Sequence, residues 1–152
     1  MSTPDPPERS FPHLKIDRDG DWYTDGMEIT HSGVLANLRG NLRQDAEGYF
    51  VQVGPVRVPV EVEDTPVTVI RVEHAGDRLR LTLNDGSDEP LDPATLRYAP
   101  GGVPYCRVKG GQFEARLTRA ATYQLAQFVQ YDEVSDVATL VLAGARYPVK
   151  KR

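Results

Sequence analysis

Residues 54–60 read GPVRVPV, and residues 144–149, near the other end of the chain, read GARYPV. Both stretches place the pattern Arg-x-Pro-Val after a glycine turn. Both also end the same order of segments: a strand, a glycine turn, an aromatic strand, a helix capped by threonine and a strand. The spacing from the caps, Thr30 and Thr118, to the two endings agrees to within one residue. The sequence therefore predicts that residues 105–149 repeat the structure of residues 16–60.

Apolar residues that alternate with polar ones mark the strands. The clearest strand follows Gly54, where four valines from Val56 to Val62 share one face. Apolar residues at helical spacing predict two helices, one over residues 30–43 and one over residues 119–130. A polar composition rich in turn residues predicts loops over residues 84–93 and 99–104.

These elements predict an α+β protein. Two copies of a strand–helix–strand unit, with mainly antiparallel sheets, intertwine into one compact protein. Residues 1–13 are predicted to be a disordered leader, because they are polar and rich in proline. Residues 14–98 form the predicted N-terminal α+β half. Residues 99–152 form the C-terminal α+β half, which contains the repeat of residues 16–60.

The charge of the chain argues against a nucleic-acid partner. Its 152 residues include 18 Lys and Arg and 22 Asp and Glu, which gives a formal net charge of −4. Nucleic-acid binders usually carry a basic field, because neutralisation of phosphates supplies much of their affinity. No apolar run suits a signal peptide or a membrane span. We therefore expect a cytoplasmic protein that binds neither nucleic acid nor membrane.

Motifs for common chemistry are missing from the sequence. The single cysteine, Cys106, allows no internal disulfide and lies in a predicted strand, where a lone cysteine behaves as a small apolar residue. The histidines, His13, His31 and His74, lack the spacing of metal ligands. The glycine patterns of phosphate sites and of the hydrolase nucleophile are absent as well. We predict no catalytic residue, no metal site and no cofactor.

An acidic run from Asp17 to Glu28, DRDGDWYTDGME, resembles a calcium-binding loop in part. It places carboxylates at positions 1, 3, 5, 9 and 12, as an EF-hand loop does. The sixth position of such a loop requires glycine for a sharp turn, and here it holds Trp22. Gly20 instead favours a hairpin turn. We therefore interpret the run as a hairpin with a solvated acidic turn.

Six side chains are candidates for a binding surface. Aromatic residues and arginine are enriched at binding hot spots. Carboxylates near a turn can do acid–base work when burial separates their pKa values. Core packing explains the aromatic residues at least as well, and solvation on the outer face of a strand explains the carboxylates. The candidate binding residues are Trp22, Arg57, Glu61, Asp64, Tyr98 and Tyr105.

Three segments are similar to one bacterial family. They are residues 16–23 (IDRDGDWY), 62–66 (VEDTP) and 104–111 (PYCRVKGG). They resemble domain-of-unknown-function family 1285, and the likeness extends over residues 14–149. The chain departs from the family pattern at Val67, where an aromatic residue is more usual, and over residues 52–58. The resemblance implies an α+β fold of two related motifs and a role in signalling. It implies no established activity, so no catalytic residue follows from it.

The sequence thus favours a non-enzymatic regulatory module that binds a small ligand or a protein partner in a groove between its repeats. The alternative is a small enzyme that uses acidic residues in a cleft between the repeats, such as Asp17, Asp19, Glu61 and Asp64. A third hypothesis, a homodimer or a subunit of a larger complex, would be signalled by a large exposed apolar patch.

Overall fold

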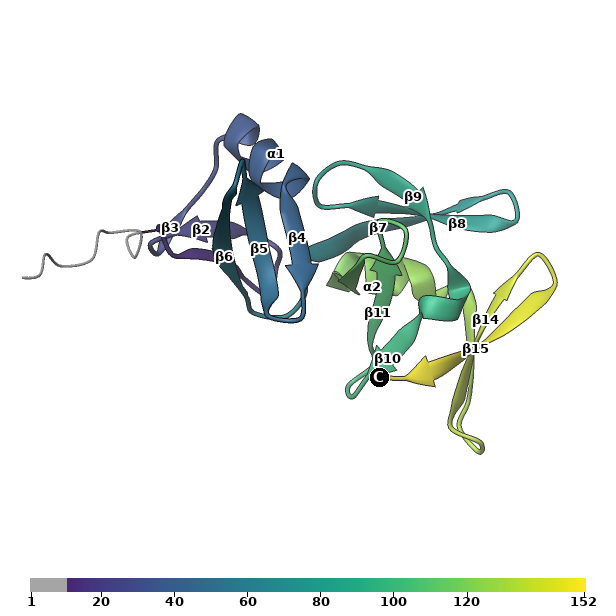
Figure 1. Ribbon diagram of the computed structural model, residues 1–152. Coiled ribbons are helices and arrows are strands. Elements are labelled where there is room, and N and C mark those ends of the chain that lie inside the picture. The colour runs from purple at the N-terminus through teal and green to yellow at the C-terminus, as the bar shows by residue number, and fades with distance from the viewer. Residues whose placement is uncertain (1–10) are drawn as a thin grey trace, which may run out of the picture. The chain divides into compact units, whose positions relative to one another are not determined.

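The computed structural model describes residues 11–152 (Figure 1), so most of the predicted leader over residues 1–13 lies outside the described residues. The chain divides into two compact units with a border between Asp64 and Thr65. We call the part up to Asp64 unit 1 and the part from Thr65 unit 2. The division predicted after residue 98 falls inside unit 2, within its fourth strand.

Unit 1 is a six-stranded mixed sheet with one short helix. The strand order is β3-β2-β1-β6-β5-β4, and β1 and β6 run parallel while the other neighbours are antiparallel. Alternate residues of these strands face one core, whose centre includes Ile16, Trp22 and Val51. The elements are β1 (Leu14–Ile16), β2 (Trp22–Thr24), β3 (Met27–Glu28), α1 (Ser32–Gly40), β4 (Leu42–Asp45), β5 (Gly48–Val53) and β6 (Val56–Val62).

Unit 2 is a nine-stranded mixed sheet in the order β13-β14-β15-β10-β11-β12-β7-β8-β9. Its core contains Leu79, Leu81 and Leu83 from β8 and Leu140 from β14. A short 3₁₀ helix, Pro93–Thr95, precedes β10. The other elements are β7 (Val67–Ala75), β8 (Arg78–Leu83), β9 (Asp88–Pro90), β10 (Arg97–Ala99), β11 (Val103–Val108), β12 (Phe113–Leu117), α2 (Arg119–Ala126), β13 (Val129–Asp132), β14 (Val137–Leu142) and β15 (Ala145–Lys151).

The two units share a strand order. Unit 2 contains β12-β11-β10-β15-β14-β13, which follows the same path as β3-β2-β1-β6-β5-β4 in unit 1. Counted along the chain, a helix follows the third of the six strands in both units: α1 follows β3, and α2 follows β12. The first of the six pairs in parallel with a later strand, β1 with β6 and β10 with β15. This match supports the predicted repeat. It begins one strand earlier than predicted, however, because β10, and not the strand that contains Tyr105, takes the place of β1.

The registers of the two ladders also agree. Tyr49 lies opposite Val60 in unit 1, and Ala138 lies opposite Val149 in unit 2. Ile16 pairs with Val62, and Tyr98 pairs with Lys151. Positions in the two units can therefore be compared one by one.

The predicted α+β class is wrong. The structure is 52% strand and 14% helix, with only two α-helices in the described residues. The two units follow one another in the chain and are not intertwined. Strand β9 lies inside the loop predicted over residues 84–93, and β10 begins at residues 97–98, for which no element was predicted. Their partners, β8 and β15, are chosen by contacts that a local pattern does not reveal. None of the helices within residues 11–152 is long and apolar enough to cross a bilayer.

Both helices are shorter than predicted. Helix α1 ends at Gly40, because Leu42, whose spacing fits a helix equally well, pairs with Val51 and begins β4. Its N-cap is His31, whose Nδ1 accepts a hydrogen bond from the Val34 N–H at 3.2 Å, and not the predicted Thr30. The predicted cap of the second helix, Thr118, is confirmed.

A partly buried ion pair ties the β8–β9 turn to the β11–β12 turn. The Lys109 ammonium lies 2.6 Å from Asp85 Oδ2, and the Lys109 backbone N–H donates to the Glu89 carboxylate at 3.0 Å. Burial alone would raise the pKa of Asp85, but hydrogen bonds from Lys109 and Ser87 outweigh it and lower the pKa to about 2. Because the pKa is lower in the folded chain than in the unfolded one, the pair stabilises the fold above the unfolded pKa, and this stabilisation is lost as the pH falls toward 2.

Replacing Asp85 should therefore have an effect that depends on pH. We expect Asp85→Asn to lower the free energy of unfolding by about 1 kcal/mol at pH 7, because a partly exposed pair is screened by solvent. The difference from the wild type should shrink as the pH falls below about 4 and vanish only below the folded pKa of about 2. Urea unfolding at several pH values measures this, with the exposed Glu133→Gln as the control. A difference that does not change with pH would contradict the ion-pair argument.

A second prediction concerns the core of unit 2. Leu81 of β8 is buried, and removing its side chain leaves a cavity. We expect Leu81→Ala to lower the free energy of unfolding by about 2–5 kcal/mol. Val134→Ala also removes apolar atoms, but at a side chain that is 98% exposed, and should change the free energy of unfolding by less than about 0.5 kcal/mol. Denaturant unfolding of both variants provides the comparison, and equal effects would contradict this core.

Candidate functional site

An open groove with a volume of about 610 Å³ lies on unit 2. Its walls come from strands β10, β13, β14 and β15 and from the turn after β10. The volume falls in the range of sites that hold small organic ligands, roughly 300–1,000 Å³. The apolar part of the wall consists of Tyr98, Pro100, Val129, Tyr131, Ala138 and Val149.

The strand register places these side chains on one face. Tyr131 lies opposite Ala138, and Ala138 lies opposite Val149. On the other side of β15, Lys151 pairs with Tyr98. Directly opposite residues in a sheet point to the same face, so the four strands together form a continuous wall.

A polar cluster lies at one end of the groove. The Tyr131 hydroxyl donates a hydrogen bond to Asp136 Oδ1, and the Lys151 ammonium pairs with Asp136 Oδ2. These two hydrogen bonds lower the pKa of Asp136, and the bond to Asp136 raises the pKa of Tyr131. The cluster therefore carries a carboxylate, an ammonium and a neutral phenol at neutral pH.

Tyr98 offers a hydroxyl that the protein leaves unused. Its ring is half-buried, and burial raises its pKa. No hydrogen bond joins its hydroxyl to another residue of the described range 11–152, although its backbone carbonyl accepts from the Arg152 N–H at 2.7 Å. A partly desolvated hydroxyl without a protein partner is a ready donor for a ligand atom.

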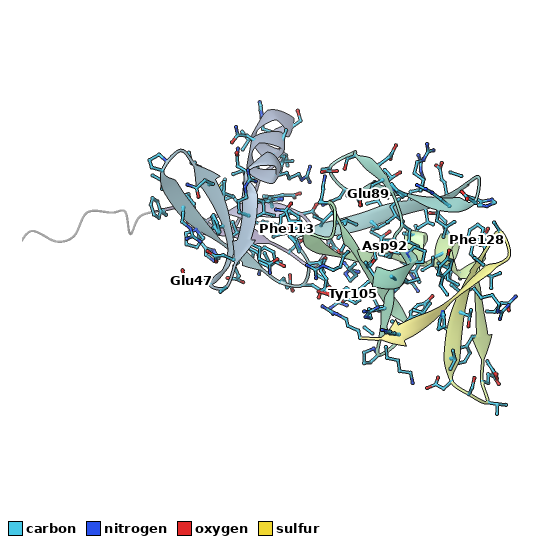
Figure 2. The ribbon with its side chains drawn as sticks, turned by 45° about the vertical axis from the view of Figure 1, so that its right-hand side comes forward. Glu47, Glu89, Asp92, Tyr105, Phe113 and Phe128 are labelled. Carbon is cyan, nitrogen blue, oxygen red and sulfur yellow. The ribbon has the colours of Figure 1, made fainter. Side chains whose placement is uncertain are left out.

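Arg152 covers another predicted binding residue. Its guanidinium lies over the ring of Tyr105 at 3.7 Å from the ring centre, and its Nη2 lies 2.9 Å from Glu114 Oε1. Tyr105, labelled in Figure 2, is buried. The arginine therefore lines the groove, while the tyrosine packs behind it.

At two corresponding positions unit 2 has smaller residues than unit 1. Trp22 pairs with Ile16 in unit 1, and the corresponding partner of Tyr98 in unit 2 is Pro104. Ala138 likewise takes the place that Tyr49 holds in unit 1. Trp22 is only 1% exposed, so its indole fills the core of unit 1. Unit 2 lacks this bulk.

Comparison with known proteins supports the architecture. No family model matches the sequence, and no curated protein matches it. Two solved structures match the fold. A DUF1285 family protein from Silicibacter pomeroyi DSS-3 has a TM-score of 0.74 and 21% identity, over 90% of this chain and 78% of that one. This chain has the DUF1285 fold.

A second solved structure agrees. A DUF1285 family protein from Shewanella baltica OS155 has a TM-score of 0.64 and 22% identity, over 76% of this chain and 91% of that one. The resemblance drawn from the sequence is thus confirmed at the level of the fold. Neither neighbour's description names an activity, so the DUF1285 fold leaves the function to be argued from the site.

The structure separates the six predicted binding residues. Tyr98 lines the groove and Tyr105 packs behind it, whereas the other four belong to unit 1. Arg57 lies over the Phe50 ring at 3.8 Å and pairs with Asp45. A binding role for Trp22, Arg57, Glu61 and Asp64 stays a prediction.

Glu61 has two neighbours of its own. The His13 Nε2 lies 3.0 Å from its Oε1, and the Lys15 ammonium lies 3.7 Å from its Oε2. Asp64 is half-buried at the end of unit 1.

Sequence reasoning missed Tyr131, Ala138 and Lys151, and the alternation over residues 137–142 was the signal that could have placed them on one sheet face.

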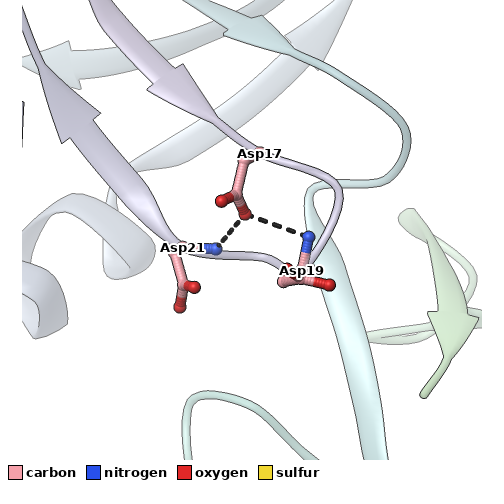
Figure 3. Close-up of side chains that lie close together, drawn as sticks. All are labelled: Asp17, Asp19 and Asp21. Carbon is pink, nitrogen blue, oxygen red and sulfur yellow. Dashed lines mark hydrogen bonds between the residues drawn. The ribbon is translucent and has the colours of Figure 1, made fainter. Parts of the chain in front are cut away.

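The acidic run folds as a hairpin, as predicted. Asp17 Oδ1 accepts hydrogen bonds from the backbone N–H groups of Asp19 at 3.0 Å and Asp21 at 2.9 Å (Figure 3). The carboxylates of Asp17, Asp19 and Asp21 lie within 4.8 Å of one another. Burial raises the pKa of Asp21, and the charges of Asp17 and Glu28 add to this. The turn that joins β1 to β2 explains the arrangement.

The single thiol lies in the core. Cys106 is buried, and burial raises its pKa to about 12. A nucleophilic cysteine needs a lowered pKa, so this thiol stays protonated and unreactive at neutral pH.

Thiol labelling tests this placement. We expect Cys106 to resist DTNB in the native protein at pH 8 and to react fully in denaturant, because its side chain becomes accessible only on unfolding. The exposed Ser135→Cys variant, which adds a thiol to the β13–β14 turn, should release one equivalent of product within minutes under native conditions. Rapid labelling of native Cys106 would contradict the buried position.

Proposed function

We propose that this chain is a non-enzymatic binding module whose groove on unit 2 holds a small, largely apolar organic ligand. One observation carries the proposal: the groove is open and preformed, and unit 1 carries the larger side chains of Trp22 and Tyr49 at the positions that correspond to Pro104 and Ala138. A protein usually fills such a space with its own side chains, since an uncovered apolar wall contributes no stability.

The wall defines the shape of the ligand. Val129, Ala138 and Val149 offer contact to an apolar body, and the rings of Tyr98 and Tyr131 offer stacking. The Tyr98 hydroxyl is available to donate to one acceptor atom. Because Asp136 and Lys151 neutralise each other, the groove favours a neutral ligand or one whose charge is small and lies at the rim.

The enzyme alternative has less support. Glu61 and Asp64, two of the carboxylates expected to do acid–base work, belong to unit 1, and the carboxylate at the groove is Asp136. Its two hydrogen bonds lower its pKa, which makes it a poor general acid or base near neutral pH.

A regulatory role in the cytoplasm, without nucleic-acid or membrane partners, is the wider part of the proposal. The acidic net charge of −4 and the single reduced thiol favour it. A ligand that binds four strands of the folded unit would stabilise that unit by mass action, which is one way to pass a signal to a partner.

The groove can be tested by filling it. The dye 8-anilinonaphthalene-1-sulfonate, an apolar two-ring probe, should bind the wild type and gain fluorescence. Ala138→Tyr places the phenol of unit 1 in the groove and should weaken binding of the dye at least about tenfold. Fluorescence titration gives both dissociation constants.

Thr139→Tyr is the matched control, because Thr139 is the next residue of β14 and points to the opposite face. It adds the same ring and should leave the affinity unchanged. If Ala138→Tyr keeps its far-ultraviolet circular dichroism and binds the dye as the wild type does, the groove is not the binding site.

A further inference from the structure

Helix α1 has an apolar side that unit 1 does not cover. None of its nine residues is buried, and Val34 is 44% exposed. Helix α2, at the same place in the strand path of unit 2, buries Ala121 and Leu125. Short amphipathic helices gain most of their stability from packing, so the uncovered side of α1 needs an explanation.

The two helices carry the same pattern from their caps. Val34 is the third residue after the cap His31, as Ala121 is after Thr118. Leu38 is the seventh residue after its cap, as Leu125 is. Helix α1 thus has apolar side chains at the two positions that α2 buries: Val34 is larger than Ala121, and Leu38 is the same residue as Leu125.

The cover of α2 is strand β7. It pairs in parallel with β12, where Val69 lies opposite Leu117, and α2 packs against it. The helix holds this strand by two hydrogen bonds. The Thr118 N–H donates to the Val69 carbonyl at 2.9 Å, and Gln124 Oε1 accepts from the Val72 N–H at 2.7 Å.

Within the described residues 11–64, unit 1 has these features but no counterpart of β7. Strand β3 takes the place of β12 and is the edge of the described sheet, and Met27 is 73% exposed. The Ile29 N–H donates to the Trp22 carbonyl at 2.8 Å, so the backbone groups of the preceding residue, Glu28, point to the open edge. Asn37 stands six residues after its cap, where α2 has Gln124.

The charges near this edge are mostly acidic. The carboxylates of Asp17, Asp19 and Asp21 lie within 4.8 Å of one another in the β1–β2 turn, and Glu28 lies on β3 itself, while Arg39 is a basic residue of α1. An open strand edge with this field suits a basic segment and repels a second copy of itself. We call the surface formed by Met27, Glu28, Val34, Asn37 and Leu38 the β3–α1 face.

We propose that the β3–α1 face binds an extended segment of a partner protein that is both apolar and basic. The segment adds to β3 as a parallel strand and lies against α1, in the place that β7 occupies in unit 2. Main-chain hydrogen bonds at β3 give affinity, and Val34 and Leu38 select apolar side chains. This surface belongs to unit 1 and is independent of the groove on unit 2.

The strand β7 itself supplies the probe. A capped peptide with the sequence of Val67–Ala75 and lysine in place of Glu73, VTVIRVKHA, is titrated into the ¹⁵N-labelled full-length protein. We expect chemical-shift changes at residues 27–38 that saturate in the millimolar range or below. The same peptide with glutamate at both basic positions should bind at least about tenfold more weakly, because it meets the acidic edge.

Two double variants distinguish binding to the β3–α1 face from nonspecific binding to exposed apolar side chains. Val34→Gln with Leu38→Gln keeps helix-forming residues and should weaken peptide binding at least about tenfold. Val53→Gln with Val56→Gln changes two similarly exposed valines of the β5–β6 hairpin and should leave binding unchanged. Asn37→Ala should weaken it about two- to tenfold, the worth of one hydrogen bond.

The proposal fails on either of two results. Millimolar peptide that moves no resonance of residues 27–38 would overturn it. So would equal peptide affinity of the two double variants, the one on α1 and the one on the β5–β6 hairpin. Either result leaves the dye titration of the groove unaffected, so the two proposals are judged separately.

Discussion

The shared strand order of the two units depends on a parallel pairing between two strands that are far apart in sequence. In unit 1 it joins β1 to β6, with Ile16 opposite Val62, and in unit 2 it joins β10 to β15, with Tyr98 opposite Lys151. Parallel neighbours cannot be joined by a tight turn, so the hairpins and the helix between them form the crossover. The register of this pair decides which residues of all six strands face the core. It also places Tyr98 next to the last strand and so creates one side of the groove.

The sequence showed those parts of the fold that are local. The valine strand, the Asp17–Asp21 hairpin and the Thr118 cap were all visible as short patterns, and the order of such patterns led to the family resemblance. The fold class was wrong because its deciding features are long-range. Residues 97–98 show no strand pattern of their own, yet they pair with β15, and Leu42 fits a helix although it pairs with Val51 in a strand.

The candidate site was harder to predict than the fold. Tyr98 was identified because aromatic residues are frequent at binding surfaces, and it does line the groove. The rest of the site includes the small side chain of Ala138, and a small side chain leaves no motif in a sequence. It becomes visible only when the ladder of unit 2 is compared with the ladder of unit 1. The open edge at β3 was hidden for the same reason, since a strand that is absent has no pattern.

The paired registers have a consequence for the search for a ligand. Trp22 and Tyr49 are the side chains that unit 1 carries at positions where unit 2 has smaller ones, on strands with the same pairing. If the groove holds a ligand as proposed, an indole and a phenol give its approximate size and flatness. Screening can begin with compounds of two to three fused or linked rings, with unit 1 as the template for the groove of unit 2.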